Sequence, residues 1–145
     1  MTKEPSEAVV DAWIALMRAQ QTALLKIERA FREAKLPPSS WYDVLWELER
    51  AGGTGLRPFE IERQRLIAQS NISRLLDRLA EAGHVERLPC DEDGRGQRIV
   101  ITPSGREMRK RMWPVYARAI GEAVGRRVSE REAASLASLL RKLVD

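Results

Sequence analysis

The chain has 145 residues, of which 43% are apolar, so it can bury a hydrophobic core without support from disulfides or structural metals. Cys90 is its only cysteine and His84 its only histidine, which excludes a tetrahedral zinc site built from cysteine and histidine ligands of one chain. The 25 basic residues outnumber the 21 acidic ones, and the resulting net charge of +4 permits a nucleic-acid partner without establishing one.

Near the start of the chain, apolar residues recur every three or four positions, which predicts a long first helix with a heptad-like seam. The seam consists of Val10, Trp13, Met17, Leu24, Ile27 and Phe31. Two prolines then end this helix. Ser40 and Asp43 have the spacing of a capping box, so a second helix is expected from there to Gly52.

The middle of the chain predicts two further helices. Thr54–Pro58 is long enough only for a minimal strand, after which Phe59–Ile67 is expected to form a short third helix. Gln69–Ala82 is expected to form the fourth helix, with Gly83 as its C-terminal stop. The apolar face of this helix consists of Ile72, Leu75, Leu76 and Leu79.

Two short strand-like runs follow, His84–Leu88 and Arg98–Thr102, and the turn-forming residues between them predict a β-hairpin. The order of short helix, tight turn, helix and hairpin is that of a winged helix-turn-helix, whose second helix enters the major groove of DNA. The expected fold class is therefore mainly α with a small β-hairpin wing, a winged helix-turn-helix lobe joined to a helical dimerisation region.

The C-terminal part predicts two more helices. Thr102 precedes Pro103 as an N-cap precedes the first helical residue, so a fifth helix is expected to about Arg127, with a kink at Pro114. A further capping-box pattern at Ser129 opens a sixth, leucine-rich helix.

The side of the fourth helix that faces away from its apolar stripe carries short or forked polar groups, which can reach the edges of bases. The candidate base-reading residues are Gln69, Ser70, Asn71, Ser73 and Arg74. Arg78 is a candidate for clamping a phosphate. The sequence leaves one alternative open, a solvated helix face, because such faces also mix arginine with acidic residues at helical spacing.

The predicted hairpin loop presents Arg95 between two glycines, where a cation can enter the minor groove. Asp93 is placed to hold the shape of the wing or to orient the Arg95 guanidinium, and Arg98 is expected to assist. The alternative is a soluble turn without a role in binding.

The segments QSNISRLLDRLAEAGHVER and DEDGRGQRIVIT resemble the MarR family of regulators, and the order of the helices extends the resemblance over nearly the whole chain. The matching residues are Arg74, Leu75, Asp77, Arg78, Leu79, Gly83, Val85, Arg87, Asp93, Arg95, Ile101 and Thr102. The chain departs from the family pattern at Ala68, where a capping serine is usual, at Arg65-Leu66 in the turn, and at Gly94, where a second arginine is common.

The resemblance implies a ligand-responsive transcriptional repressor that binds double-stranded DNA at a pseudo-palindromic operator as a homodimer. It also implies a single domain over residues 1–145, with dimerisation helices at about 6–35 and 103–145 and the winged helix-turn-helix lobe at about 38–102. The heptad-like seam and the leucine-rich C-terminus agree with a dimer, but they fit packing within one chain equally well.

Members of this family are commonly released from DNA by small aromatic or anionic effectors bound between the dimerisation helices and the DNA-binding lobe. The residues of this chain suited to such a pocket are Trp13, Met17, Trp41, Tyr42, Leu45, Met112 and Tyr116. The same residues also fit an ordinary core. Cys90 is expected to be inert, because the acidic residues that follow it disfavour the thiolate.

No arrangement of nucleophile, base or metal ligands accompanies these motifs, so the chain is not expected to be an enzyme or to need a cofactor, and His84 is expected to be structural. The rival hypothesis is a winged-helix protein-interaction module without specific DNA binding. No apolar run approaches the roughly 20 residues of a membrane span, and the first residues lack a secretory pattern. We therefore expect a cytoplasmic protein, nucleoid-associated when bound to DNA.

Overall fold

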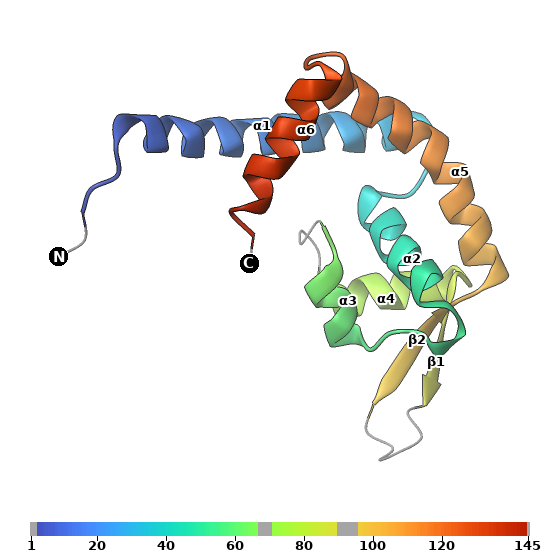
Figure 1. The fold of residues 1–145 in the computed structure, drawn as a ribbon. Coiled ribbons are helices and arrows are strands. Elements are labelled where there is room, and N and C mark those ends of the chain that lie inside the picture. The colour runs from blue at the N-terminus through green and yellow to red at the C-terminus, as the bar shows by residue number, and fades with distance from the viewer. Residues whose placement is uncertain (1–2, 67–70, 90–95, 145) are drawn as a thin grey trace. The chain divides into compact units, whose positions relative to one another are not determined.

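The computed structural model describes residues 3–66, 71–89 and 96–144. In chain order the elements are α1 (Glu7–Glu33), α2 (Ser39–Ala51), the 3-10 turn η1 (Gly52–Thr54), α3 (Pro58–Gln64), α4 (Ile72–Glu81), β1 (Val85–Pro89), β2 (Gln97–Ile101), α5 (Pro103–Ile120), the π-helical turn η2 (Gly121–Gly125) and α6 (Glu130–Arg141) (Figure 1). This mainly helical chain with one antiparallel hairpin confirms the expected fold class.

The chain divides into two compact units, one formed by Met1–Ala30 with Ala117–Asp145 and the other by Phe31–Tyr116. The second unit contains α2, α3, α4 and the hairpin, packed around a common apolar core (Figure 1). The buried core residues are Val44, Leu45, Leu48, Ile61, Leu75, Leu76, Leu79, Val85, Ile99 and Ile101. Each helix therefore contributes its apolar face, as the helical periodicity predicts.

The hairpin pairs β1 with β2 in antiparallel register, from Val85 opposite Ile101 to Pro89 opposite Gln97. Leu56 adds a single bridge on the other side of β2: its N–H donates to the Ile99 carbonyl at 3.0 Å, and the Ile99 N–H donates back at 2.8 Å. The minimal strand expected within Thr54–Pro58 is thus present as a single bridge. Through it, the chain just before α3 is hydrogen-bonded to β2 of the wing.

Three of the predicted helix ends are confirmed. Gly83 lies just after α4 with a φ of 80°, a left-handed conformation that glycine adopts without steric cost. The Thr102 hydroxyl accepts from the Gly105 N–H at 3.1 Å and so caps α5. The Ser129 hydroxyl accepts from the Glu132 N–H at 3.1 Å, while the Glu132 carboxylate accepts from the Ser129 N–H at 2.9 Å, which completes the capping box of α6.

Other predicted boundaries were wrong. Ser40 does not cap α2: the N-cap is Pro38, no side chain caps it, and the helix begins at Ser39. The third helix ends at Gln64 rather than Ile67, because Arg65 adopts an extended conformation. Propensity alone could not locate these ends, since they depend on contacts made elsewhere in the chain.

The boundaries of the fourth and fifth helices also differ from those predicted. α4 begins at Ile72 rather than Gln69, because Asn71 takes the N-cap position. α5 continues through Pro114 and ends at Ile120 rather than near Arg127, and a π-helical turn follows it. The glycines at both ends of this turn, with no Cβ to pack, favour such an irregular winding.

The first unit leaves many large apolar side chains exposed. On α1 they are Val9, Val10, Trp13, Ile14 and Leu25, and at the C-terminal end of the described chain they are Leu136, Leu139, Leu143 and Val144.

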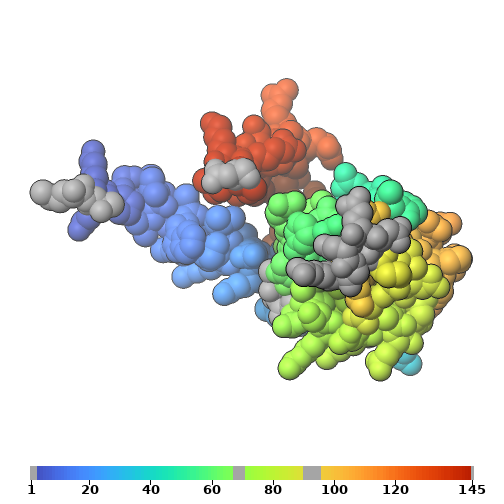
Figure 2. Space-filling view, turned by 90° about the horizontal axis from the view of Figure 1, so that it is seen from below, coloured from blue at the N-terminus to red at the C-terminus, as the bar shows by residue number. Residues whose placement is uncertain are grey.

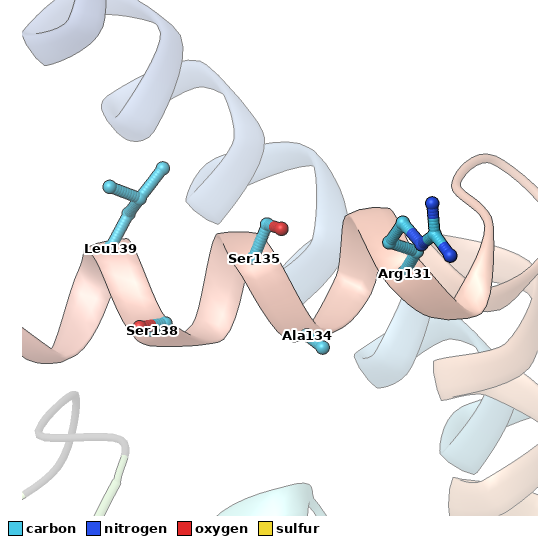
Figure 3. Close-up of a pocket in the computed structure, with 5 residues that line it drawn as sticks. All are labelled: Arg131, Ala134, Ser135, Ser138 and Leu139. Atoms are coloured by element: carbon cyan, nitrogen blue, oxygen red, sulfur yellow. The ribbon is translucent and has the colours of Figure 1, made fainter.

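α6 borders a hollow of about 490 Å³ (Figure 3). The hollow is lined by Arg131, Ala134, Ser135, Ser138 and Leu139. Among the described residues, the five that line this hollow all belong to one helix. Within the described residues, no helix is long and apolar enough to cross a membrane.

Replacing Gly105 with alanine is expected to destabilise the second unit. An added Cβ would lie 2.2 Å from the carbonyl oxygen of His84 and 2.8 Å from a side-chain carbon of Ile101, so backbone would have to move. We expect a loss of about 2–3 kcal/mol in the free energy of unfolding, measured by urea denaturation. Gly53→Ala is the matched control, since no described atom lies within 4 Å of its Cβ. Equal stability of the two variants would contradict the close packing at Gly105.

Candidate nucleic-acid interface

α4 presents a polar face to solvent. Ser73, Arg74 and Arg78 are exposed, while the opposite face is buried, with Leu75, Leu76 and Leu79 between 0% and 2% exposed. The predicted division of this helix is therefore confirmed. Arg74 and Arg78 are one turn apart, so one helix face offers two guanidinium groups and a hydroxyl for contact with a ligand.

Asn71 holds the start of α4 in place. Its side-chain oxygen accepts from the N–H groups of Ser73 at 2.9 Å and Arg74 at 3.2 Å. These bonds satisfy two of the amides that a helix leaves free at its first turn. This chain has Ala68 where the MarR family usually has a capping serine, and the N-cap of α4 in the structure is Asn71.

Asp77, one of the two exposed acidic residues of α4 together with Glu81, forms an ion pair with Arg87 of β1. The two side chains are 64% and 33% exposed, so the pair contributes about 1 kcal/mol or less to stability. Its larger effect is on the local charge, because it neutralises a carboxylate between Arg74 and Arg78. Both residues belong to the motif that resembles the MarR family, but nothing in the sequence predicts that they pair.

The hairpin brings one further predicted residue to the surface. Arg98 is exposed on β2, where its partner across the strands is Leu88. Figure 2 shows the side chains of α3, α4 and the hairpin, coloured green to gold, on one face of their unit. Gln69, Ser70, Asp93 and Arg95 lie outside the described residues, as does Cys90.

His84 is a packed structural residue. Its side chain is buried, and its Nδ1 lies 2.9 Å from the Ser104 hydroxyl oxygen. Its ring packs edge to face against that of Trp41, with the ring centroids 5.8 Å apart. Desolvation by burial, with a smaller contribution from the positive charge of Arg111, lowers the pKa of His84 from its ordinary value. The folded protein therefore favours a neutral imidazole.

The His84 shift predicts a loss of stability in mild acid. As pH falls below the ordinary histidine pKa of 6.5, the unfolded chain takes up a proton that the folded protein resists. The free energy of unfolding should therefore fall from pH 7 to pH 5. In His84→Gln, measured by urea denaturation over the same range, this decrease should be smaller. Parallel pH profiles for the two proteins would contradict it.

Most residues of the predicted effector pocket in the second unit are engaged in packing. Leu45 and Met112 are fully buried. Tyr42 and Tyr116 meet edge to face with ring centroids 5.0 Å apart. Trp41 is partly buried and also packs against the core, whereas Trp13 and Met17 belong to the other unit. The effector pocket therefore stays a prediction.

The arrangement of α3, α4 and the hairpin is that of a winged helix-turn-helix protein, with α4 in the position of the recognition helix. A solved structure supports this class: Sco3205, a MarR family transcriptional regulator from Streptomyces coelicolor, in complex with DNA. It superimposes with a TM-score of 0.86 over 99% of this chain and 89% of Sco3205. The two sequences are 24% identical, so this likeness establishes the fold alone.

The sequence comparisons point to the same class of protein. The MarR family model matches residues 35–96, which contain α2, α3, α4 and β1 and end just before β2. The transcriptional repressor IacR from Pseudomonas putida is 30% identical over 103 residues, which span 71% of this chain and 59% of IacR. The multiple antibiotic resistance protein MarR from Salmonella typhimurium is 27% identical over 103 residues, 71% of this chain and 70% of that protein. Over its middle part the chain is therefore similar to regulators of the MarR family.

Proposed function

We propose that this protein is a sequence-specific DNA-binding transcriptional regulator. The observation that carries the proposal is the outer face of α4, where Ser73, Arg74 and Arg78 are exposed and the intervening carboxylate of Asp77 is paired with Arg87. Such a face offers donors for guanine and phosphate, and the ion pair offsets the carboxylate that lies between the two arginines, while the exposed Glu81 stands at the far end of the helix. The similarity to IacR, named as a transcriptional repressor, and to Sco3205, solved in complex with DNA, supports this function.

In this proposal the contacts divide into base reading and phosphate binding. The start of α4 reads bases in the major groove with Gln69, Ser70, Asn71, Ser73 and Arg74. Arg78 binds a phosphate and so fixes the orientation of the helix. On the wing, Arg95 enters the minor groove, Asp93 orients it, and Arg98 adds a cation at its base.

We further propose that the regulator acts as a homodimer on a pseudo-palindromic operator. The exposed apolar side chains of α1 and α6 are the supporting observation, because monomers seldom leave so many large apolar groups in water. A two-fold dimer presents two recognition helices, and each reads one half-site.

Regulation by a small effector is part of the same proposal. An aromatic or anionic compound that binds the DNA-free form better than the DNA-bound form would release the operator and relieve repression. Its proposed pocket involves Trp13, Met17, Trp41, Tyr42, Leu45, Met112 and Tyr116, of which the buried members must move to admit a ligand. The protein would act in the cytoplasm, associated with the nucleoid when bound to DNA, and without catalytic activity.

A salt titration tests the DNA-binding function. The protein is mixed with labelled DNA from its own promoter and, in parallel, with DNA of scrambled sequence. We expect tighter binding to the promoter and a logarithm of affinity that falls linearly with the logarithm of salt concentration, with a slope of about −0.9 per neutralised phosphate. Binding that is absent, or equal for both DNAs, would instead favour a winged-helix protein-interaction module.

A further inference from the structure

Asp43 is a carboxylate in the middle of the core-facing side of α2. The next two residues, Val44 and Leu45, are fully buried, and Asp43 itself is only 6% exposed. Burial of a carboxylate costs free energy unless its oxygens receive hydrogen bonds. The capping-box role expected for Asp43 does not supply them, because Pro38 is the N-cap of α2.

The carboxylate is used instead at a distance along the chain. Its Oδ2 accepts from the backbone N–H of Leu66 at 2.6 Å, across 23 residues. Leu66 lies just after α3, where Arg65 has turned the chain into an extended conformation. A hydrogen bond from an amide to a charged oxygen is about twice as strong as one between neutral groups.

Leu66 has no apolar anchor of its own, since its side chain is 79% exposed. The Arg65 side chain is buried, but its ion pair at 3.0 Å is with Glu62 of α3 and therefore stays local. The bond to Asp43 thus ties the chain that leaves α3 to α2.

We propose that Asp43 is a positioning residue for DNA recognition, whose carboxylate holds the backbone at Leu66 against α2 and thereby sets where α4 begins relative to the DNA. The inference rests on the proposed function. The core holds α4 mainly through the buried Leu75, Leu76 and Leu79, whereas Ile72 in its first turn is only partly buried against that core, so the position of the first turn depends also on the chain that precedes it. That first turn is the part of a recognition helix that reads bases.

The test combines hydrogen exchange with DNA binding in the full chain. In Asp43→Ala we expect the Leu66 amide to exchange about tenfold faster, since a hydrogen bond to a charged group is lost. We also expect the ratio of promoter to scrambled-DNA affinity to fall about tenfold, with an unchanged salt slope because the phosphate contacts remain. Asp43→Asn keeps an acceptor without the charge and should show smaller changes in both measurements.

Val44→Ala is the matched control, because it also creates a defect on the buried side of α2 but keeps the Asp43 carboxylate that binds the Leu66 amide. Its melting temperature should fall, but its Leu66 exchange and its DNA discrimination should match those of the wild type. If Asp43→Ala discriminates like the wild type, or if Val44→Ala loses as much discrimination, the positioning role is overturned while the proposed function stands. If the wild type itself prefers no sequence, the proposed function fails, and the positioning role fails with it.

Discussion

Replacing Arg74 with alanine is expected to remove most of the preference for operator DNA while leaving weak, salt-sensitive binding in place. Arg74 is exposed on the first turns of α4, where its forked guanidinium can bind a guanine edge in two places. Loss of such a contact costs about 1–3 kcal/mol, or roughly 10- to 100-fold in affinity for each recognition helix. Fluorescence anisotropy with promoter and scrambled DNA measures both affinities.

Arg126→Ala is the matched control for this variant. It removes the same charge from an exposed arginine that belongs to the other compact unit and not to the helix-turn-helix. Its promoter preference should equal that of the wild type. Unchanged discrimination in Arg74→Ala would show that α4 does not read the sequence through this residue.

Replacing Leu139 with glutamate is expected to convert a dimer into monomers and to weaken operator binding by about 100-fold or more. Leu139 is 58% exposed on α6, within the apolar surface proposed to join two chains. A carboxylate there would have to be buried without a partner on association. Because a dimer links two half-site contacts, its loss removes the gain from bivalent binding, about 100- to 10,000-fold. Analytical ultracentrifugation measures the oligomeric state directly.

Ser138→Glu provides the control for charge. Ser138 is exposed and adjacent in sequence, but it points about 100° away around the helix. This variant should remain dimeric and bind the operator like the wild type. A wild-type protein that sediments as a monomer would overturn the proposed dimer, as would a Leu139→Glu variant that remains fully dimeric.

Local patterns in the sequence were sufficient for much of the fold. The stripe of Leu75, Leu76 and Leu79 predicts a buried face at helical spacing, and the structure has all three in the core. Gly83 and Ser129 were identified as helix-end residues, and both act as expected. In each case the interacting groups lie within a few residues of one another, so propensity and spacing carry the information.

Interactions between distant residues were not predictable in this way. Asp43 has capping-box spacing, yet its carboxylate binds the Leu66 amide. Asp77 looks like one acidic residue on a solvated face, yet it pairs with Arg87 across the turn into the hairpin. Such pairs depend on how elements pack, which periodicity within one helix does not encode.

The same limit applies to the link between α2 and α5. The Arg109 Nε lies 2.9 Å from the Glu49 carboxylate, and the guanidinium stands 5.1 Å from the centre of the Trp46 ring. Burial would lower the pKa of Arg109, but hydrogen bonds to Glu49 and Tyr42 raise it overall. No motif in the sequence joins these residues, since their proximity depends on the packing of two helices.

Selection of bound DNA from a random-sequence pool tests the central claim most directly. The wild-type protein is incubated with a library of random duplexes, and the retained molecules are sequenced after several rounds. A homodimer with one recognition helix per chain should enrich a pseudo-palindrome whose half-sites are separated by about one turn of DNA, roughly 10 base pairs from centre to centre. Recovery of no common sequence would contradict sequence-specific recognition, and a single unrepeated half-site would contradict the symmetric dimer.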